Sequence, residues 1–309
     1  MEPYIAVTNP SWFQHLRAQA DGQGRLDEVN FWNPSGKTLK NFTPGTPIFF
    51  RLKAPYKCIA GYGFFAVFHP MRLDLAWDCF GPKNGADDSY ALSTLTQKEK
   101  HAVIGCTVLR NVILWPENRW LPWQADQDWA KAGPQRGKTE RNLHLASKLI
   151  DEIHYDSLYA PEEIVDAFTL VDVDEREVAQ AKVKPRLGQG TFRTRLLQAY
   201  DGRCAITGEH TEIVLDAAHI QPYLGPQSNH IRNGLLLTKE FHTLFDAGYV
   251  TITPEYKVRV SPRLHADWDN GHRYYAVDGQ QLLVLPQQEA LCPQPEVLAW
   301  HGQRRFLAG

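Results

Sequence analysis

The distribution of charge divides this sequence into a front and a back half, and this division most constrains how the chain can fold. Residues 151–177 carry ten acidic side chains and one basic one, whereas residues 182–203 carry six basic side chains and one acidic one. A Pro- and Gly-containing segment at 185–190 breaks the pattern and opens the back half. At roughly 150 residues per domain, 309 residues predict two domains. We expect a front domain at 1–145, an acidic helical linker at 146–184 and a second domain at 185–309.

The composition is that of a globular chain and excludes several classes of protein. Hydrophobic residues at 43% and charged residues at 22% suffice for a core in each half. No run approaches ~20 apolar residues, and residues 1–4 lack the start of a secretory signal, so neither a membrane span nor export is expected. The five cysteines form an odd set without a C-x-x-C pair. This disfavours a disulfide framework or a Cys-rich zinc site and fits a reducing cytoplasm.

The front half is rich in aromatic residues and strand-like. Short apolar runs alternate with Pro and Gly punctuation, and they lie at 48–52, 64–68 and 103–109. Helical spacing occurs at 10–20 and around 93–101. A small β-barrel with flanking helices is the simplest architecture for this pattern. With the mixed elements of the back half, the chain is predicted to be α+β.

The back half combines short helices and strands with three spaced polar side chains. His219 ends a strand-like run, Asn233 follows 14 residues later, and His242 lies a further nine residues on, within a short helix. His242 and Asp246 are four residues apart, so they project from one helix face, as two ligands of one metal ion must. The expected elements are helices at 191–200 and 239–245, strands at 213–220 and 249–252, and an amphipathic tail at 295–306 that packs back on the core.

These side chains match the needs of phosphodiester hydrolysis. The reaction needs a base for water, a cation to neutralise charge on the phosphate, and a group that holds the base in place. His219 can act as the base, His242 and Asp246 can hold the cation, and Asn233 can fix the geometry. Taken singly, each has a plainer interpretation, since a lone His is usually a hydrogen-bonded structural residue and Asn-Gly is usually a turn. Their order and spacing together favour a hydrolytic site.

Residues from about 186 to 300 resemble the HNH (ββα-metal) nucleases. The resemblance is carried by Ala217–Ile220 (AAHI), Asn233–Leu237 (NGLLL) and His242–Gly248 (HTLFDAG). It implies His219 as general base, Asn233 as orienting residue and His242 with Asp246 as ligands of one divalent metal ion, Mg²⁺ or Mn²⁺, with Co²⁺ or Ni²⁺ as alternatives.

The chain departs from many HNH nucleases at the residue before the base. Where those enzymes place a metal-binding Asp or His, this chain has Ala218. Either Asp216 replaces that ligand or water fills the position, and a salt-bridged strand residue is the plainer interpretation of Asp216. The zinc-binding C-x-x-C pairs of some HNH proteins are also absent, so Cys204 is expected to be a packing residue.

The front half resembles the EVE domain of the PUA-like superfamily, which includes readers of modified bases. The matching segments are Tyr4–Thr8, 28–36, 44–55, 61–65, 76–81, 84–85 and 104–106. An EVE domain fused to an HNH domain resembles a modification-dependent restriction endonuclease. The resemblance implies recognition of double-stranded DNA that carries 5-methylcytosine or 5-hydroxymethylcytosine.

A reader of a methyl group on cytosine needs a close-fitting aromatic pocket. Enclosing the base requires flipping it out of the stack, which costs a few kcal/mol that stacking on Trp or Tyr can offset. Hydrogen bonds to the Watson–Crick edge then select cytosine. Core packing is the alternative for each Trp. The candidates are aromatic or polar residues at turns: Trp32 with Asn33 and Ser35 first, then Trp12, and Trp77 with Asn84.

Basic side chains in two segments are candidates for contacts with DNA phosphates. They are Arg136 and Lys138 before the acidic run, and Arg193 and Arg195 on the predicted helix that opens the back half. Solvated surface charge is the alternative for each of them.

The sequence therefore predicts a cytoplasmic, metal-dependent DNA endonuclease that leaves 5′-phosphate ends and responds to cytosine modification. HNH domains usually nick one strand, so a double-strand cut would need a homodimer or two engaged copies. Two alternatives stay open. The front domain could read unmodified DNA, or the chain could be a modified-base binding protein whose nuclease is degenerate, as Ala218 allows.

Overall fold

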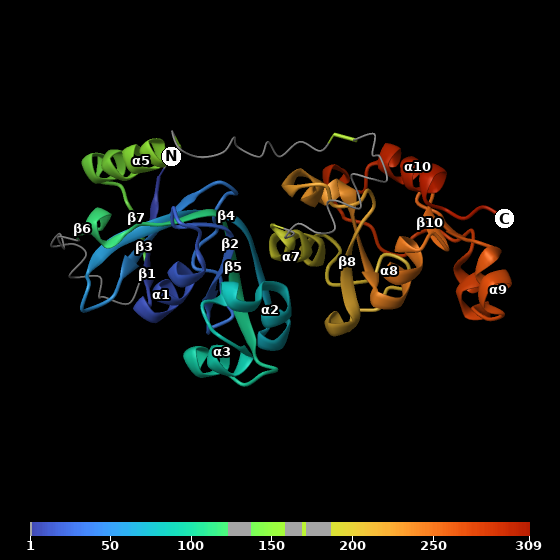
Figure 1. Ribbon diagram of the computed structural model, residues 1–309, viewed down its shortest axis with the longest axis horizontal. Coiled ribbons are helices and arrows are strands. Elements are labelled where there is room, and N and C mark those ends of the chain that lie inside the picture. The colour runs from blue at the N-terminus through green and yellow to red at the C-terminus, as the bar shows by residue number, and fades with distance from the viewer. Residues whose placement is uncertain (1, 123–136, 158–168, 171–186) are drawn as a thin grey trace. The chain divides into compact units, whose positions relative to one another are not determined.

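The computed structural model describes residues 2–122, 137–157, 169–170 and 187–309. The chain divides into two compact units, Met1–Glu163 and Ile164–Gly309, which are described separately below (Figure 1). Both helices and strands occur in each unit, so the chain is α+β as predicted. Among the described residues, no helix has the length and apolar character needed to cross a bilayer.

The first unit is built on one mixed sheet of seven strands in the order β2-β5-β4-β3-β1-β7, with β6 paired to β4. β1 runs parallel to β3, and the remaining pairs are antiparallel. Among the described strands, no pairing joins β2 at one end of this order to β7 at the other. The described strands therefore do not close into the small β-barrel that the sequence predicted, whereas the α+β class is confirmed. The strands are β1 (Tyr4–Thr8), β2 (Arg25–Asn33), β3 (Pro47–Leu52), β4 (Cys58–Arg72), β5 (Val103–Leu114), β6 (Leu121–Pro122) and β7 (Lys138–Thr139).

The helices of the first unit begin where the sequence supplies caps. Asn9 accepts a hydrogen bond from the Ser11 amide at the start of α1, and Asp88 accepts one from the Ala91 amide at the start of α3. The segment predicted as helical around 93–101 is helical only to Thr96, because Gln97 adopts a left-handed conformation. The helices are α1 (Pro10–Gln19), α2 (Leu73–Phe80), the 3₁₀ turns η1 (Gly81–Asn84) and η2 (Glu117–Arg119), α3 (Ser89–Thr96) and α5 (Leu143–Ser157).

Helix α5 packs on the core of the first unit. Leu149 is fully buried in a cluster with Ile5, Phe49 and Trp115. Asp156 accepts hydrogen bonds from the Trp115 indole at 2.9 Å and from Arg119 at 2.7 Å. Some of the acidic run therefore stabilises this helix rather than only facing solvent. The segment predicted as a linker, 146–184, begins within this helix.

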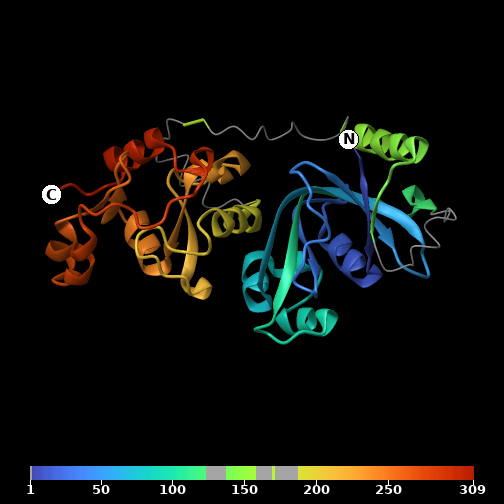
Figure 2. The ribbon, with the colours of Figure 1, turned by 180° about the vertical axis from the view of Figure 1, so that it is seen from behind.

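Two antiparallel strand pairs, β8 with β9 and β10 with β11, form the described sheets of the second unit. Short helices accompany them (Figure 2). β8 pairs antiparallel with β9, and α8 follows β9 directly, which gives a ββα unit. The elements are α7 (Gln189–Ala199), η3 (Glu212–Val214), β8 (Leu215–His219), η4 (Pro226–Asn229), η5 (Ile231–Asn233), β9 (Gly234–Thr238), α8 (Lys239–Asp246), β10 (Val250–Ile252), β11 (Val258–Val260), α9 (Arg263–Trp268), η6 (His272–Val277), η7 (Glu289–Leu291) and α10 (Pro295–Arg304).

The C-terminal helix α10 packs back on the unit, as its amphipathic pattern predicted. Val297 and Leu298 are fully buried. His301, also buried, stacks on Phe245 of α8 with ring centroids 3.7 Å apart. Its Nε2 donates to the Phe245 carbonyl at 3.2 Å, and its Nδ1 accepts from the Thr251 hydroxyl at 2.8 Å. These contacts fix the end of α8, which carries two of the predicted metal ligands.

Candidate active site

The predicted base, His219, is the last residue of β8 and is half-buried. Its ring stacks on Phe192 of α7, with centroids 4.2 Å apart and planes 14° apart, and meets the edge of Tyr223. Nε2 lies 2.9 Å from Oδ1 of Asn229. Phe192 therefore contacts one face of the imidazole and Asn229 contacts one of its nitrogens, and these two contacts set the orientation of the ring.

Asn233 acts on the backbone beside His219 rather than on a reacting group. Its side chain is fully buried. Oδ1 accepts from the Gln221 amide at 2.8 Å, and Nδ2 donates to the carbonyls of Gln221 and Ser228, each at 3.0 Å. The main-chain carbonyl of Asn233 also accepts from the Ile220 amide. Asn233 thus ties the connecting loop to the end of β8, which agrees with an orienting role.

His242 lies between two carboxylates. On α8 it faces Asp246, one turn on, with Nε2 and Oδ2 separated by 3.4 Å. Its Nδ1 lies 2.8 Å from Oδ2 of Asp216 on β8. The side chain of Asp246 is 64% exposed, whereas His242 is 20% and Asp216 is 38% exposed. The helix period places His242 beside Asp246, and the packing of α8 on β8 adds Asp216.

The electrostatics keep Asp216 ionised. Burial alone would raise its pKa, but the hydrogen bond from His242 and the positive charges of His242 and Arg193 outweigh burial and lower the pKa. A carboxylate that accepts from Nδ1–H holds the imidazole in place and makes the opposite nitrogen a better ligand.

The donor set of His242 and Asp246 fits a divalent ion. Two neighbouring ligands of an octahedral Mg²⁺, each about 2.1 Å from the ion, lie about 3.0 Å apart. Nε2 and Oδ2, 3.4 Å apart, are within a few tenths of an ångström of this spacing. Among the described residues, no group of three or more His, Cys, Asp or Glu forms a ready metal cluster. The remaining positions would be filled by water and substrate phosphate, as is usual for Mg²⁺.

Burial explains the missing acid before His219. Ala218 is fully buried, so a carboxylate at this position would be costly to ionise. Asp216, two residues earlier, lies on the same face of β8 and is only half-buried. Cys204 is also fully buried and unpaired.

The predicted phosphate contacts differ in their surroundings. Arg193 is half-buried on α7 and donates to the Leu215 carbonyl at 3.1 Å, next to Asp216. Arg195, on the same helix, is also half-buried. Lys138 in β7 forms an ion pair with the buried Glu140 at 3.2 Å. Arg136 lies outside the described residues. Arg193 thus contacts β8, the strand that carries Asp216, and Asp216 in turn contacts His242.

The predicted base-pocket residues gather around η1 of the first unit. Trp32 is half-buried and donates from its indole to the Asn84 carbonyl at 2.8 Å. Trp77 and Trp32 both pack against the small cluster of Leu73, Ala86 and Leu92. The Asn84 side chain is fully buried and donates to the carbonyls of Ala76 and Gly81.

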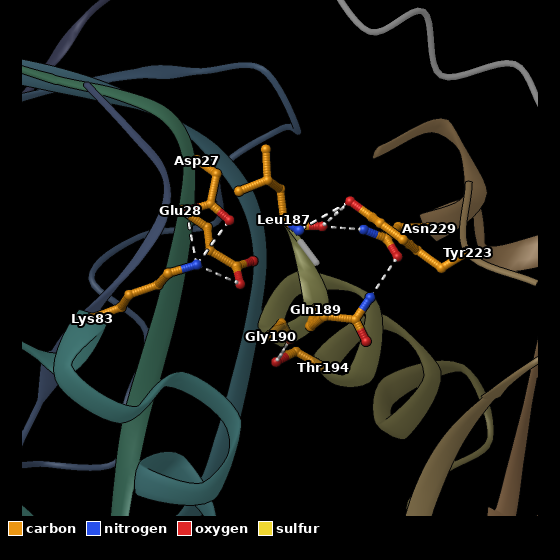
Figure 3. Close-up of polar contacts among 9 residues, drawn as sticks. All are labelled: Asp27, Glu28, Lys83, Leu187, Gln189, Gly190, Thr194, Tyr223 and Asn229. Carbon is orange, nitrogen blue, oxygen red and sulfur yellow. Dashed lines mark hydrogen bonds and ion pairs between the residues drawn. The ribbon is translucent and has the colours of Figure 1, made fainter. Parts of the chain in front are cut away.

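The remaining candidates make local contacts. Trp12 is a core residue, with its ring at the edges of Phe31 and Phe50. Asn33 accepts from the Ser35 amide and donates to the Lys37 carbonyl, so it stabilises its own turn. On the neighbouring segment, Lys83 forms ion pairs with Asp27 at 2.7 Å and with the buried Glu28 at 3.6 Å (Figure 3).

Two polar residues, one in each unit, were not predicted from the sequence. Asn30 of β2 is fully buried and donates to Asn84 Oδ1 at 2.8 Å, and in the second unit Asn229 contacts His219. Asn30 lies at an alternate position from Trp32 along β2, which is the signal that could have found it. For Asn229 the sequence carries no local signal, because its partners are brought together by the fold.

The second unit thus combines a ββα unit with a His–carboxylate group. Residues 204–253 match the HNH endonuclease family, so the chain contains an HNH endonuclease domain. No curated protein sequence matches the chain.

Similar solved structures include the ASCH protein from Zymomonas mobilis, with 12% identity and a TM-score of 0.34 over 48% of this chain and 94% of that protein. A point variant of that protein has 13% identity and a TM-score of 0.34, over 49% and 98% of the two chains. The modification-dependent TagI restriction endonuclease has 13% identity and a TM-score of 0.26, over 96% of this chain and 80% of that one.

Proposed function

We propose that this protein is a metal-dependent endonuclease that cuts double-stranded DNA carrying 5-methylcytosine or 5-hydroxymethylcytosine. The observation that carries the proposal is the ββα unit of an HNH domain, with His219 at the end of β8 and His242 between two carboxylates. In this proposal the second unit cuts and the first unit reads the modification. Action on invading DNA would take place in the cytoplasm.

The residues of the second unit divide the chemistry of hydrolysis among them. His219 takes a proton from the attacking water, and Asn233 keeps the backbone beside it in place. His242 and Asp246 hold the divalent ion, Mg²⁺ or Mn²⁺, while Asp216 orients His242. When bound, the ion would neutralise charge on the phosphate and on the leaving 3′-oxygen. The products would carry 5′-phosphate and 3′-hydroxyl ends.

The first unit offers an aromatic and polar group suited to a flipped base. Trp32 is half-buried, and its indole N–H is fixed by the Asn84 carbonyl, so its ring has a set orientation for stacking. Stacking on such a ring offsets the few kcal/mol needed to extrude a base. Trp32 is therefore our first choice for the modified-base pocket.

Digestion of a matched pair of plasmids tests the proposal. One plasmid carries modified cytosine and the other does not, and each is incubated with the full chain and Mg²⁺ or Mn²⁺. We expect cleavage of the modified plasmid only. Equal cleavage of both plasmids would contradict the proposal and support the alternative of an HNH nuclease whose front domain reads unmodified DNA. Binding of the modified plasmid without cleavage in any metal would leave a binding protein with a degenerate nuclease. If both strands are cut, the oligomeric state on DNA shows whether two copies act together.

A further inference from the structure

Asn229 contacts the proposed base through a network that no sequence motif predicted. We infer that Asn229 is a positioning residue that fixes His219 in the tautomer protonated on Nε2 and so leaves Nδ1 as the basic nitrogen. The inference rests on the proposed role of His219 and extends it to the segment that precedes α7. Figure 3 shows the contacts of Asn229 with Leu187 and Gln189.

The orientation of the Asn229 amide follows from its partner on one side. Nδ2 lies 2.6 Å from the main-chain carbonyl oxygen of Leu187, and a carbonyl oxygen can only accept a hydrogen bond. The NH₂ group of Asn229 must therefore face Leu187, which directs Oδ1 the other way. Oδ1 accepts from Gln189 Nε2 at 3.0 Å.

The state of the imidazole follows from the orientation of the amide. His219 Nε2 lies 2.9 Å from Asn229 Oδ1, an acceptor, so Nε2 must carry a proton. A neutral imidazole has one N–H, so its Nδ1 then holds the lone pair. A general base needs a defined lone pair in the neutral ring. Asn229 therefore selects the form of His219 that can take a proton through Nδ1.

The segment before α7 is shaped to hold Asn229. Gly188 has a φ of +74°, and a Cβ built there would lie 2.9 Å from Asn229 Nδ2. Glycine is thus required both by the backbone conformation and by the close approach of the amide. The Leu187 amide also donates to the Tyr223 hydroxyl at 2.9 Å, while Tyr223 meets the ring of His219. Residues 187–189 thus hold Asn229 and Tyr223, and both of these side chains contact the imidazole.

NMR of the imidazole nitrogens in the full chain tests the tautomer directly. The signals of His219, one of 12 histidines, are assigned by their loss in His219→Gln. Spectra are recorded above the ordinary imidazole pKa of about 6.5, where the ring is neutral. We expect a protonated Nε2 with a slowly exchanging proton and an unprotonated Nδ1. A proton on Nδ1 would overturn the inference.

Kinetics of two variants at one position test the consequence. Asn229→Leu keeps the approximate size but removes the acceptor, and Asn229→Asp keeps an acceptor for Nε2–H. On plasmid with modified cytosine, we expect Asn229→Leu to lower the single-turnover rate at saturating enzyme at least about tenfold with an unchanged Kd for DNA. Asn229→Asp keeps the acceptor but loses the donor to the Leu187 carbonyl, so it should recover only part of this loss. Asn270→Leu, at an exposed asparagine of the same unit, is the control and should leave the rate unchanged.

Equal rates for the wild type and Asn229→Leu would overturn the inference. If melting curves show that both variants are unfolded, the NMR measurement of the His219 tautomer in the wild type tests the inference instead. A failure of the proposed function gives a different result. In that case His219→Ala leaves cleavage unchanged or the wild type cuts no DNA, whereas the NMR measurement still reports which nitrogen of His219 is protonated.

Discussion

At the scale of single residues, the proposed function gives the two carboxylates that contact His242 different tasks. Asp246 lies against Nε2 at a spacing that suits two ligands of one ion, and Asp216 accepts from Nδ1 at hydrogen-bond distance. A metal-binding histidine usually donates its second N–H to such a carboxylate. The structure therefore favours Asp216 as the residue that orients a ligand, whereas the sequence suggested that it could be a ligand itself.

Titration calorimetry with Mn²⁺ can separate these two tasks. We expect Asp246→Ala to abolish measurable binding, because it removes a ligand. Asp216→Asn should weaken binding only about 10–100-fold, because an amide oxygen can still accept from Nδ1–H. Asp246→Asn serves as the isosteric control for Asp246. The reverse result, with Asp216→Asn the more damaging change, would make Asp216 the ligand.

His301 predicts a pH dependence of stability for the second unit. Burial lowers its pKa to about 3, opposed in part by the hydrogen bond to the Phe245 carbonyl, whereas an unfolded histidine has a pKa of about 6.5. Between these values the unfolded chain binds a proton that the folded chain does not. The free energy of unfolding should therefore fall on acidification below pH 6.5, by up to about 1.4 kcal/mol per pH unit from this residue.

Urea unfolding across this pH range measures the effect. His301→Gln can make the same two hydrogen bonds but does not titrate, so its stability should change less steeply with pH than that of the wild type. Parallel pH profiles for the two proteins would contradict the assignment.

At the scale of secondary structure elements, α5 shows how packing decides the extent of a unit. From the sequence we expected an acidic linker here, but Leu149 lies fully buried against Trp115, and Asp156 accepts two hydrogen bonds. Burial of Leu149 and the hydrogen bond from the Trp115 indole to Asp156 therefore pack the helix on the core of the first unit.

Truncation of one apolar residue on α5 tests this. Leu149→Ala should lower the free energy of unfolding of the first unit by about 2–5 kcal/mol, because it leaves a cavity. Leu143→Ala is the matched control on the same helix, where the side chain is 84% exposed, and should change stability by no more than about 0.5 kcal/mol. Denaturant unfolding monitored by tryptophan fluorescence measures both variants. Equally small changes in the free energy of unfolding would show that α5 is not part of the folded unit.

Gly234 shows the same principle in the second unit. The Asn-Gly pair there suggested a turn, yet Gly234 has an extended backbone and begins β9. A Cβ at this position would lie 2.7 Å from Phe192, the residue on which His219 stacks. The glycine is present because α7 packs closely on β9, and no local turn requires it.

At the scale of the whole molecule, the two units carry separable tasks under the proposed function. Trp32 belongs to the first unit and His219 to the second. His219→Ala should abolish cleavage of modified DNA and leave its Kd unchanged, because the base is lost and the reader is intact. Trp32→Ala should lower the preference for modified over unmodified plasmid and retain cleavage.

Cleavage and filter-binding assays on the matched plasmids measure both variants, and Trp268→Ala, at an exposed tryptophan, is the control for Trp32→Ala. Unchanged preference in Trp32→Ala would move the pocket to other residues. Cleavage by His219→Ala at the wild-type rate would remove His219 from the chemistry.

The sequence alone determined which side chains are candidates for the site and which elements carry them. A helix repeats every 3.6 residues, so the spacing of His242 and Asp246 already placed both on one face. The strand pattern placed His219 at the end of a strand. The resemblance to the HNH nucleases then assigned roles to His219, Asn233 and His242. The α+β class followed from the same local periodicities.

Only the tertiary structure decided which distant groups complete these sites. Asp216 meets His242 across 26 residues, Leu187 holds Asn229 across 42, and His301 meets Phe245 across 56. Tertiary packing also buried Trp12 in the core, and the described strands of the sheet do not close into a barrel. Local periodicity records which face of an element is apolar, but the partner of a polar side chain is set when separate elements pack, and that is a property of the folded chain.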